Sequence, residues 1–386
     1  MIEKLKRFNW ISFGAMIALI ALGTVAVWSS GHARETVFHR VWLNHLGGAA
    51  VGLCAYFALA ACDYRRLFDI FAKPAYSGAL VLLVAVLLFG AEIDGGRRWL
   101  WFFQPSELAK LCVIVFLAQL FGAPDGFRGR FGFRGAFAAA FVLGLPCVLI
   151  LLEPDLGTAL ALVPAGLVML LAAGVWRRGL LLILAIGGIL AATVLGVVFE
   201  AERPGVSPEK RERILAYVPL KPHQVQRVKT FLFPESDPLG AGYNLKQALI
   251  AIGSGGYSGK GVGKGESNHL KYLPPSVSMN DFIFCVYAEE TGFVGSLALL
   301  ALYGLVCLSG VWVAWRAGEG RGRLVALGVS TLVFAHVYVN IAMSIGLVPI
   351  TGIPLPFISA GRTFLVTVIA GLGLVQSVSL HREEIT

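Results

Sequence analysis

The sequence predicts an all-α integral membrane protein with about ten membrane-spanning helices. Hydrophobic residues make up 57% of the 386 residues and charged residues only 14%, whereas soluble chains carry about 25% charged residues. Apolar runs recur along the whole chain, each long enough to cross about 30 Å of hydrocarbon as a helix. They lack the strict alternation of barrel strands. Because lipid satisfies no backbone hydrogen bonds, helices are the expected spanning elements.

Ten apolar segments are the expected spans. The first follows a charged N-terminus, but its apolar region is long and no small-x-small cleavage site follows. We therefore expect an uncleaved helix rather than a signal peptide. The third span is short, and the eighth is long enough to tilt or to project beyond the bilayer. The expected spans are residues 11–30, 43–62, 76–91, 105–122, 135–152, 157–174, 179–199, 281–313, 323–348 and 357–380.

The distribution of Lys and Arg predicts the orientation of these spans. One set of short loops and termini holds 15 such residues, and the alternate set holds only four, at positions 34, 40, 97 and 98. Positive charge accumulates on the cytoplasmic side, so we expect both the N- and the C-terminus in the cytoplasm. The one large loop, residues 200–280 between spans 7 and 8, is then extracytoplasmic. Residues 1–386 are expected to form a single membrane domain.

The large loop is basic and rich in glycine. It carries 11 Lys/Arg against seven Asp/Glu, a helical stretch over 244–252 and the run GSGGYSGKGVGKG. Such a surface on the outer leaflet suits an anionic headgroup or a diphosphate; a solvated loop with flexible turns is the alternative. The run is not a nucleotide-binding phosphate loop, because Gly261 stands after Lys260 where that motif requires Ser or Thr.

Ionisable side chains in or beside the spans are the candidate functional residues, because hydrocarbon accepts them only when they are paired or functional. Glu107 and Lys110 share a helix face at i, i+3 and can neutralise each other, which a structural ion pair would also explain. Asp155 lies between spans 5 and 6, where a helix N-cap is the alternative. Glu289 and Glu290 are adjacent in span 8, so at least one faces the protein interior.

Asp281 lies where the large loop enters span 8. A helix N-terminus favours an ionised carboxylate, which could accept a proton; capping is again the alternative. Before span 10, three prolines within eight residues, Pro349, Pro354 and Pro356, force irregular backbone that must be buried in protein or line a wet cavity. Arg362 follows just inside an apolar span, where a phosphate or carboxylate partner is expected.

Five segments together resemble the SEDS family (shape, elongation, division and sporulation), which includes RodA and FtsW. They occur in the family's order and spacing and cover most of the chain from about residue 90. Residues 234–244 and the GKG that follows are more similar to the RodA branch, which serves cell elongation and cell shape, than to the FtsW branch. The segments are GGRRWLWFFQPSELAKL (95–111), EPDLGTA (153–159), QALIAIGSGGYSGKGVG (247–263), DFIFCVYAEETGFVG (281–295) and NIAMSIGLVPITGIPLPFIS (340–359).

This resemblance implies a ten-span peptidoglycan glycosyltransferase of the bacterial cell wall. It would join lipid II into glycan strands on the outer face of the cytoplasmic membrane and release undecaprenyl diphosphate. Asp281 matches the family's essential aspartate, for which the implied role is general base toward the acceptor sugar's 4-hydroxyl. A single displacement with inversion is the simplest expectation. Glu107, Lys110 and Asp155 match positions that are thought to shape the family's central cavity.

The leaving diphosphate implies fixed positive charge, for which Arg97 or Arg98 and loop lysines such as Lys260 are the candidates. A divalent cation, Mg²⁺ or Mn²⁺, is compatible with such a leaving group, but the sequence reveals no ligand set. The expected partners are lipid II, membrane lipids and a class B penicillin-binding protein whose transpeptidase crosslinks the strands. No nucleic-acid partner is expected.

Two stretches of the chain depart from the pattern of the SEDS family. Pro275 stands in place of an acidic residue, Met279-Asn280 in place of His-Thr, and residues 359–363 read SAGRT in place of SYGGS. Two alternatives therefore stay open. A lipid-linked precursor flippase or transporter would also use ten spans around a polar cavity, and a non-catalytic scaffold of the elongation machinery would tolerate these changes. The large loop leading into Asp281 favours the polymerase, because a transporter needs no exposed base on one face.

Overall fold

The structure is a computed structural model that describes residues 6–32, 40–93, 96–101, 103–122, 133–175, 177–203, 206–216, 222–266 and 272–382. Within these ranges ten helices are long and apolar enough to cross a membrane, which confirms the predicted fold class. They are α2 (Trp10–His32), α3 (Val41–Ala61), α4 (Tyr64–Phe89), α5 (Pro105–Gly122), α6 (Phe133–Leu152), α7 (Leu156–Ala173), α8 (Arg177–Ala201), α14 (Ile283–Arg316), α15 (Gly320–Ser344) and α16 (Arg362–His381).

Two of the predicted boundaries were wrong by five residues or more, and the ninth span ends at Ser344 rather than near residue 348. Helix α4 begins at Tyr64, not near residue 76, because the Asp63 side chain caps it by accepting a hydrogen bond from the Arg65 amide, and Pro74 is accommodated inside the helix. The first turns of α4 are polar, so a prediction from hydropathy placed the start of the helix too late. Helix α16 begins at Arg362 rather than near residue 357, because the residues before it are irregular.

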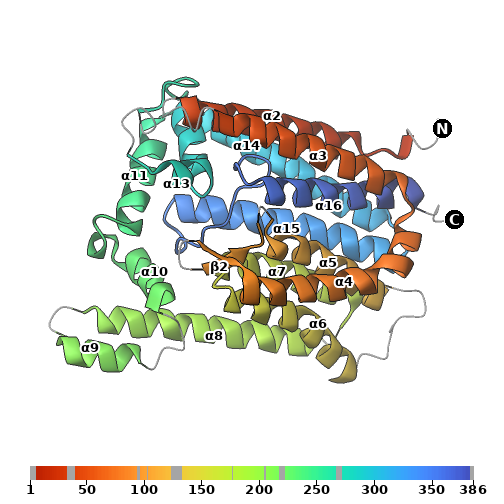
Figure 1. The fold of residues 1–386 in the computed structure, drawn as a ribbon, viewed down its shortest axis with the longest axis horizontal. Helices are drawn as coiled ribbons and strands as arrows, with labels where there is room; N and C mark the ends of the chain where they lie inside the picture. Colours follow the sequence, from red (N-terminus) through yellow and green to blue (C-terminus); the bar gives the residue numbers. More distant parts are fainter. Residues whose placement is uncertain are drawn as a thin grey trace.

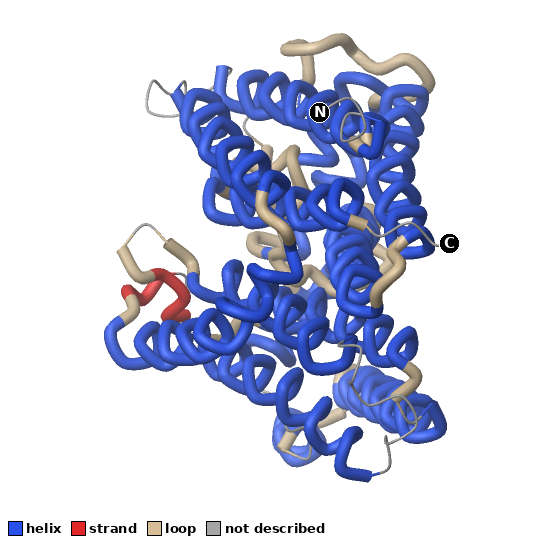
Figure 2. Tube along the Cα trace, turned by 90° about the vertical axis from the view of Figure 1, so that its right-hand side faces the viewer, coloured by secondary structure: helices blue, strands red, loops and turns tan. Residues whose placement is uncertain are grey.

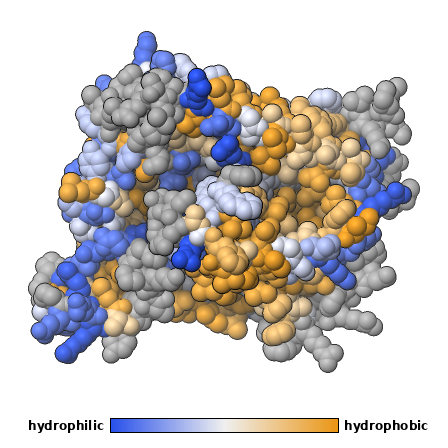
Figure 3. Space-filling model, viewed as in Figure 1, coloured by the Kyte–Doolittle hydropathy of each residue, from blue (hydrophilic) through white to orange (hydrophobic). Residues whose placement is uncertain are grey.

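The spanning helices run side by side, with both chain termini at one end of the bundle (Figure 1). The segment between α8 and α14 covers the opposite end and contains α9 (Pro208–Leu215), α10 (Pro222–Leu232), a short 3₁₀ turn (Pro234–Ser236), α11 (Ala241–Ser254) and α13 (Pro275–Met279). The predicted helical stretch 244–252 lies within α11. A space-filling view shows apolar residues across the middle and polar residues toward both ends (Figure 3).

A small β-hairpin is the one addition to the all-α architecture among the described residues. Strands β1 (Ala91–Ile93) and β2 (Gly96–Trp99) pair antiparallel. Figure 2 shows the hairpin as a projection beside the helices, seen from the end that carries the termini. Neighbouring residues of a strand point to opposite faces, so the hairpin gives Arg97 and Arg98 different surroundings.

Helix α14 is broken at Gly292, whose backbone (φ 68°, ψ −163°) is not helical. The glycine-rich run packs into this break. The amides of Phe293 and Val294 donate to the carbonyls of Gly256 and Tyr257 (2.9 and 3.2 Å), and the Gly261 amide donates to the Glu290 carbonyl (2.9 Å). The predicted long span therefore consists of two helical pieces. The backbone groups that lose their helical partners at the break form hydrogen bonds with the glycine-rich run instead.

The residues between α15 and α16, 345–361, are irregular, and most of those from 351 to 359 are buried. This confirms the interpretation of the three prolines. The segment packs closely on α2, since a Cβ on Gly23 would lie 2.1 Å from the carbonyl oxygen of Phe357. Small residues commonly permit such close approach between elements in a membrane.

Replacing Gly23 with Ala is expected to destabilise the protein, because overpacking of this kind costs about 1–3 kcal/mol. Gly14→Ala is the matched control on the same helix. A Cβ there meets no atom within 4 Å, and Ala favours a helix by roughly 0.5–1 kcal/mol over Gly. Thermal unfolding of the purified protein should show a lower midpoint for Gly23→Ala only. Equal midpoints for the two variants would contradict the close contact.

Candidate active site

Asp281 lies in the turn between α13 and α14 with its side chain half-buried. Its backbone is held by Asn340 on α15, which donates through Nδ2 to the carbonyls of Asp281 (2.9 Å) and Ile353 (2.7 Å). Its carboxylate lies beside Gly352, where a Cβ would be 3.6 Å from Oδ2. The N-cap position of α14 is Phe282, one residue later. Asp281 is thus fixed by neighbouring elements and is not the capping residue of α14.

Asp155 joins the starts of two spanning helices. Its carboxylate caps α7 by accepting from the Thr158 amide (3.1 Å) and hydroxyl (2.7 Å), so the N-cap given as the alternative is present. The same carboxylate accepts from Gln104 Nε2 (3.1 Å) in the residues leading into α5. It therefore links the α6–α7 turn to the start of α5, where Glu107 lies.

The hairpin separates the two candidate arginines. Arg97 is exposed, whereas Arg98 is partly buried and donates to the carbonyls of Glu153 (3.3 Å) and Pro154. These residues form the turn that leads to Asp155. Of the two arginines, Arg98 is therefore the one that contacts the turn before Asp155, and the sequence alone did not distinguish them.

Arg227, on α10, is a site residue that the sequence analysis missed. Its Nη1 donates to the Thr351 carbonyl (3.1 Å), one residue from the Gly352 that borders Asp281. Burial and the neighbouring charge of Arg98 lower its pKa from the ordinary arginine value, and attraction to Asp281 and Asp155 only partly opposes this. The cluster therefore joins Arg227, Arg98, Asp155 and Asp281. The sequence marked Arg227 only as one of the basic residues of the large loop.

Glu153 is a fully buried carboxylic acid beside this cluster. Neither of its side-chain oxygens makes a hydrogen bond to any described residue. Burial and the nearby charge of Asp155 raise its pKa to about 8, with Arg98 acting in the opposite direction. A carboxylic acid with this pKa is largely neutral at pH 7.

Inside the bundle, Glu107 and Lys110 form the predicted ion pair (Nζ–Oε2 2.8 Å) and both are almost completely buried. Lys110 Nζ also lies 2.9 Å from His336 Nε2 on α15. Because an ammonium group only donates, the imidazole nitrogen accepts this hydrogen bond. Lys110 in addition lies 5.1 Å from the centre of the Phe364 ring. His336, which the sequence analysis did not single out, is thus a hydrogen-bond acceptor for the buried lysine.

Lys260 and Arg362 lie in different surroundings. Lys260 is ion-paired with Glu289 (2.9 Å) and Glu266 (3.3 Å), so its charge stabilises the glycine-rich loop on α14. Both Glu289 and Glu290 are buried, as the prediction for that pair required. Arg362 is exposed at the first residue of α16, and no carboxylate in the described part of the chain pairs with it.

The two stretches that depart from the family pattern contact each other. The Ala360 amide donates to the Met279 carbonyl (3.1 Å), and Ser359 Oγ donates to the Asn280 carbonyl (2.7 Å). The changes at 279–280 and at 360, 362 and 363 therefore lie in neighbouring parts of the fold, next to Asp281.

The described residues do not fit a protein-held metal site. They bring together no group of three His, Cys, Asp or Glu that could bind a metal ion, and the cluster at Asp281 contains two guanidinium groups. Mg²⁺ needs several oxygen ligands from protein or substrate. No step of the chemistry is assigned to a cation held by this chain.

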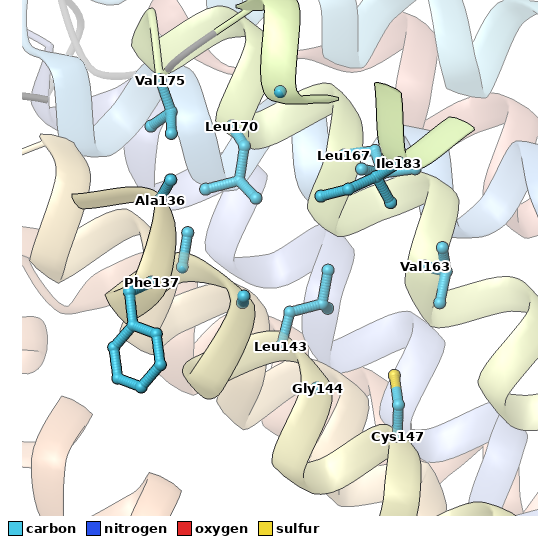
Figure 4. Close-up of a pocket in the computed structure, with 13 residues that line it drawn as sticks. Ala136, Phe137, Leu143, Gly144, Cys147, Val163, Leu167, Leu170, Val175 and Ile183 are labelled. Atoms are coloured by element: carbon cyan, nitrogen blue, oxygen red, sulfur yellow. The ribbon is translucent and has the colours of Figure 1, made fainter. Parts of the chain in front are cut away.

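A cavity of about 430 Å³ lies between α6, α7 and the start of α8 (Figure 4). Its walls are apolar, as Leu143, Cys147, Leu167 and Ile183 illustrate. Without an acid, a base or a fixed charge, this cavity offers nothing for group transfer.

The family model of the FtsW/RodA/SpoVE cell cycle proteins matches residues 9–384. The chain is 35% identical over 376 residues to the peptidoglycan glycosyltransferase MrdB of Escherichia coli K12, covering 95% of this chain and 92% of that protein.

Several solved structures share this fold. One is described as "Structural coordination of polymerization and crosslinking by a peptidoglycan synthase complex", with a TM-score of 0.74, 30% identity and coverage of 96% of this chain and 97% of the other. The crystal structure of the rod shape determining protein RodA from Thermus thermophilus has a TM-score of 0.66 and 28% identity, covering 98% of each chain.

The ion pair at the centre of the bundle generates a stability prediction. Lys110→Met leaves Glu107 buried and unpaired, which should lower the free energy of unfolding by about 3–5 kcal/mol. The double variant Lys110→Met/Glu107→Gln should recover part of this loss. Arg203→Gln is the control, because its exposed pair with Glu200 contributes at most about 1 kcal/mol. Thermal unfolding measures all four proteins, and equal losses in the single and double variants would refute the pairing.

Glu153 generates a prediction on pH. Because its folded-state pKa is raised from 4.5 to about 8, the folded protein holds a proton that the unfolded chain has released, and stability falls as the pH rises between these values. Glu153→Gln removes this dependence. Its unfolding midpoint should match wild type at pH 5 and exceed it at pH 8. A difference that is the same at both pH values would contradict the buried, neutral acid.

Proposed function

This chain belongs to the SEDS (FtsW/RodA/SpoVE) family and is a peptidoglycan glycosyltransferase, and we propose that Asp281 is the base of its polymerisation of lipid II. The observation that carries this proposal is the position of Asp281. The carboxylate is half-buried, its backbone is tied to α15, and it borders a cluster that holds both acidic and basic groups. We propose that the chain forms a single membrane domain around this cluster.

The proposed reaction is one displacement at the anomeric carbon of the donor. Asp281 takes the proton of the acceptor sugar's 4-hydroxyl, and the oxygen forms the new glycosidic bond. The bond to the diphosphate breaks with its electron pair, so undecaprenyl diphosphate leaves and the configuration inverts. Arg98 offers fixed positive charge where the negative charge develops. A divalent cation enters this proposal only as a companion of the substrate's diphosphate.

The protein is a multi-pass bacterial membrane protein, and we propose that its termini are cytoplasmic. The excess of Lys and Arg in one set of loops supports this orientation. Both termini lie at the end of the bundle opposite the segment that contains α10, α11 and α13 (Figure 1). In this orientation Asp281 and the cluster face the outer side, where a polymerase of translocated lipid precursors must act.

We further propose that the chain works in cell elongation with a class B penicillin-binding protein. A peptidoglycan synthase complex is among the solved structures of this fold, and polymerised strands need a transpeptidase to crosslink them. A flippase and a non-catalytic scaffold are the rival functions. Neither needs a base at Asp281, so that residue distinguishes the three.

The test compares wild type with Asp281→Asn, each purified with its partner and given labelled lipid II. The amide keeps the size of the side chain but cannot accept the proton, so polymer formation should fall by about 10²-fold or more. Asp69→Asn, which alters an exposed pair with Arg321, should stay near wild type. Unchanged polymerisation by Asp281→Asn would refute the assignment, and transfer of lipid across vesicles without polymer would favour the transporter.

A further inference from the structure

We infer that the apolar cavity between α6, α7 and α8, here called the inner cavity, holds one acyl chain of an anionic phospholipid. Thirteen described residues line it, among them Leu143, Cys147, Leu167 and Ile183 (Figure 4). It shares no described lining residue with the cluster at Asp281, so the inference goes beyond the proposed function. It does use the orientation proposed above, in which both termini of the polypeptide are cytoplasmic.

The inner cavity lies at the end of the bundle that carries the N- and C-termini. Helix α9 follows α8 and lies at the opposite end (Figure 1), so the first residues of α8 lie at the end with the termini. There the cavity is lined by Gly179 and Ile183 of α8, by Val175 just after α7, and by α6 from Ala136 onward. Because this end is cytoplasmic in the proposed orientation, the cavity lies in the inner half of the bilayer.

The depth of the inner cavity matches one leaflet of a bilayer. Along α6 its lining extends from Ala136 to Cys147, which corresponds to about 16 Å at 1.5 Å per residue. The hydrocarbon core of a membrane is about 30 Å thick, so the cavity reaches about halfway across it. An acyl chain that enters from the cytoplasmic leaflet covers the same distance before it reaches the centre of the bilayer.

The inner cavity is too narrow for a helix. Its volume is about 430 Å³, and over a depth of about 16 Å this volume corresponds to a mean cross-section of roughly 27 Å². A helix with its side chains is at least about 10 Å in diameter and has about three times that cross-section. A single hydrocarbon chain fits the cavity, whereas a spanning helix of a partner or of a second copy does not.

The inner cavity is open to lipid on one side. Phe137 on α6 is 66% exposed and Ile183 on α8 is 54% exposed, although both side chains line the cavity. Residues 181–190 of α8 are all exposed, so this half of the helix packs little against the described part of the protein. An acyl chain in the cavity supplies that packing, since it lies between α8 and the pair α6 and α7.

Positive charge lies at the mouth of the inner cavity. Arg177 is the first residue of α8, and the exposed Arg178 directly precedes Gly179 of the lining. The described lining itself contains no charged residue. An apolar cavity with basic residues at its cytoplasmic end matches a phospholipid, whose charge lies at one end of its hydrocarbon chains. The cytoplasmic leaflet contains anionic lipids, which Lys and Arg near its surface attract.

The test is native mass spectrometry of the purified full-length protein in detergent, titrated separately with dioleoylphosphatidylglycerol and dioleoylphosphatidylcholine. Gly144→Leu places a side chain in the cavity without a clash, because a Cβ on this lining glycine meets no atom within 4 Å. It should weaken binding of the first phosphatidylglycerol about tenfold or more, because the leucine excludes methylene groups from the cavity. Gly78→Leu on α4, where a Cβ also meets no atom within 4 Å, should bind this lipid as wild type does.

Arg178→Gln tests the contribution of charge. It should reduce the preference for phosphatidylglycerol over phosphatidylcholine about fivefold, which is the effect of one basic residue near an anionic headgroup. Binding of phosphatidylcholine should not change, because this lipid carries no net charge. Arg66→Gln is the matched control, because Arg66 is exposed near the start of α4, and it should keep the wild-type preference.

Equal affinity of wild type and Gly144→Leu for phosphatidylglycerol would overturn the inference, and so would an unchanged lipid preference in Arg178→Gln. A dimer of the wild type that Gly144→Leu separates would assign the cavity to a second copy instead. If Gly144→Leu does not fold, Ala140→Leu at an exposed lining position of α6 takes its place. Asp281→Asn should bind phosphatidylglycerol as wild type does, so failure of the catalytic proposal is distinguishable from failure of this inference.

Discussion

The irregular segment 345–361 is the constraint on which the rest of the structure depends. A non-helical backbone inside a membrane bundle must find hydrogen-bond partners within the protein. Asn340 supplies one to Ile353, Arg227 one to Thr351, and Tyr303 one to Pro356. Ser359 in turn joins the segment to Asn280. Each of these partners belongs to a different part of the chain, so satisfying this segment brings α10, α13, α14 and α15 together around Asp281.

The buried charges follow the same logic. Lys110 contacts Glu107 within its own helix, but His336 and Phe364 come from α15 and α16. Asp155 likewise connects the start of α7 with the residues before α5. A cost of several kcal/mol for each unpaired ion makes these contacts specific for one arrangement of the helices. Buried polar side chains therefore favour one relative arrangement of these helices.

Local pattern was sufficient to predict the spans, the Glu107–Lys110 pair and the cap at Asp155, because each depends on residues a few positions apart. The prolines before α16 also predicted irregular, buried backbone. Arg227 and His336 could not be found in this way. Their roles depend on contacts with Thr351 and Lys110, which are distant in sequence and have no local signature. The choice between Arg97 and Arg98 depended on a hairpin that hydropathy does not reveal. The early start of α4 depended on the cap at Asp63, which hydropathy does not reveal either.

The break at Gly292 divides α14 into two rods that the glycine-rich run bridges, because this run bonds to Glu290 on one side of the break and to Phe293 and Val294 on the other. The shorter rod carries the residues that follow Asp281 and is clamped by the glycine-rich run. The longer rod, from Phe293 to Arg316, meets the bilayer with exposed side chains such as Leu297, Leu308 and Trp312. Helices adapt to bilayers of different thickness by tilting. The longer rod is bonded at Phe293 and Val294 to the same loop that holds the shorter rod, so its tilt is coupled to the residues that follow Asp281.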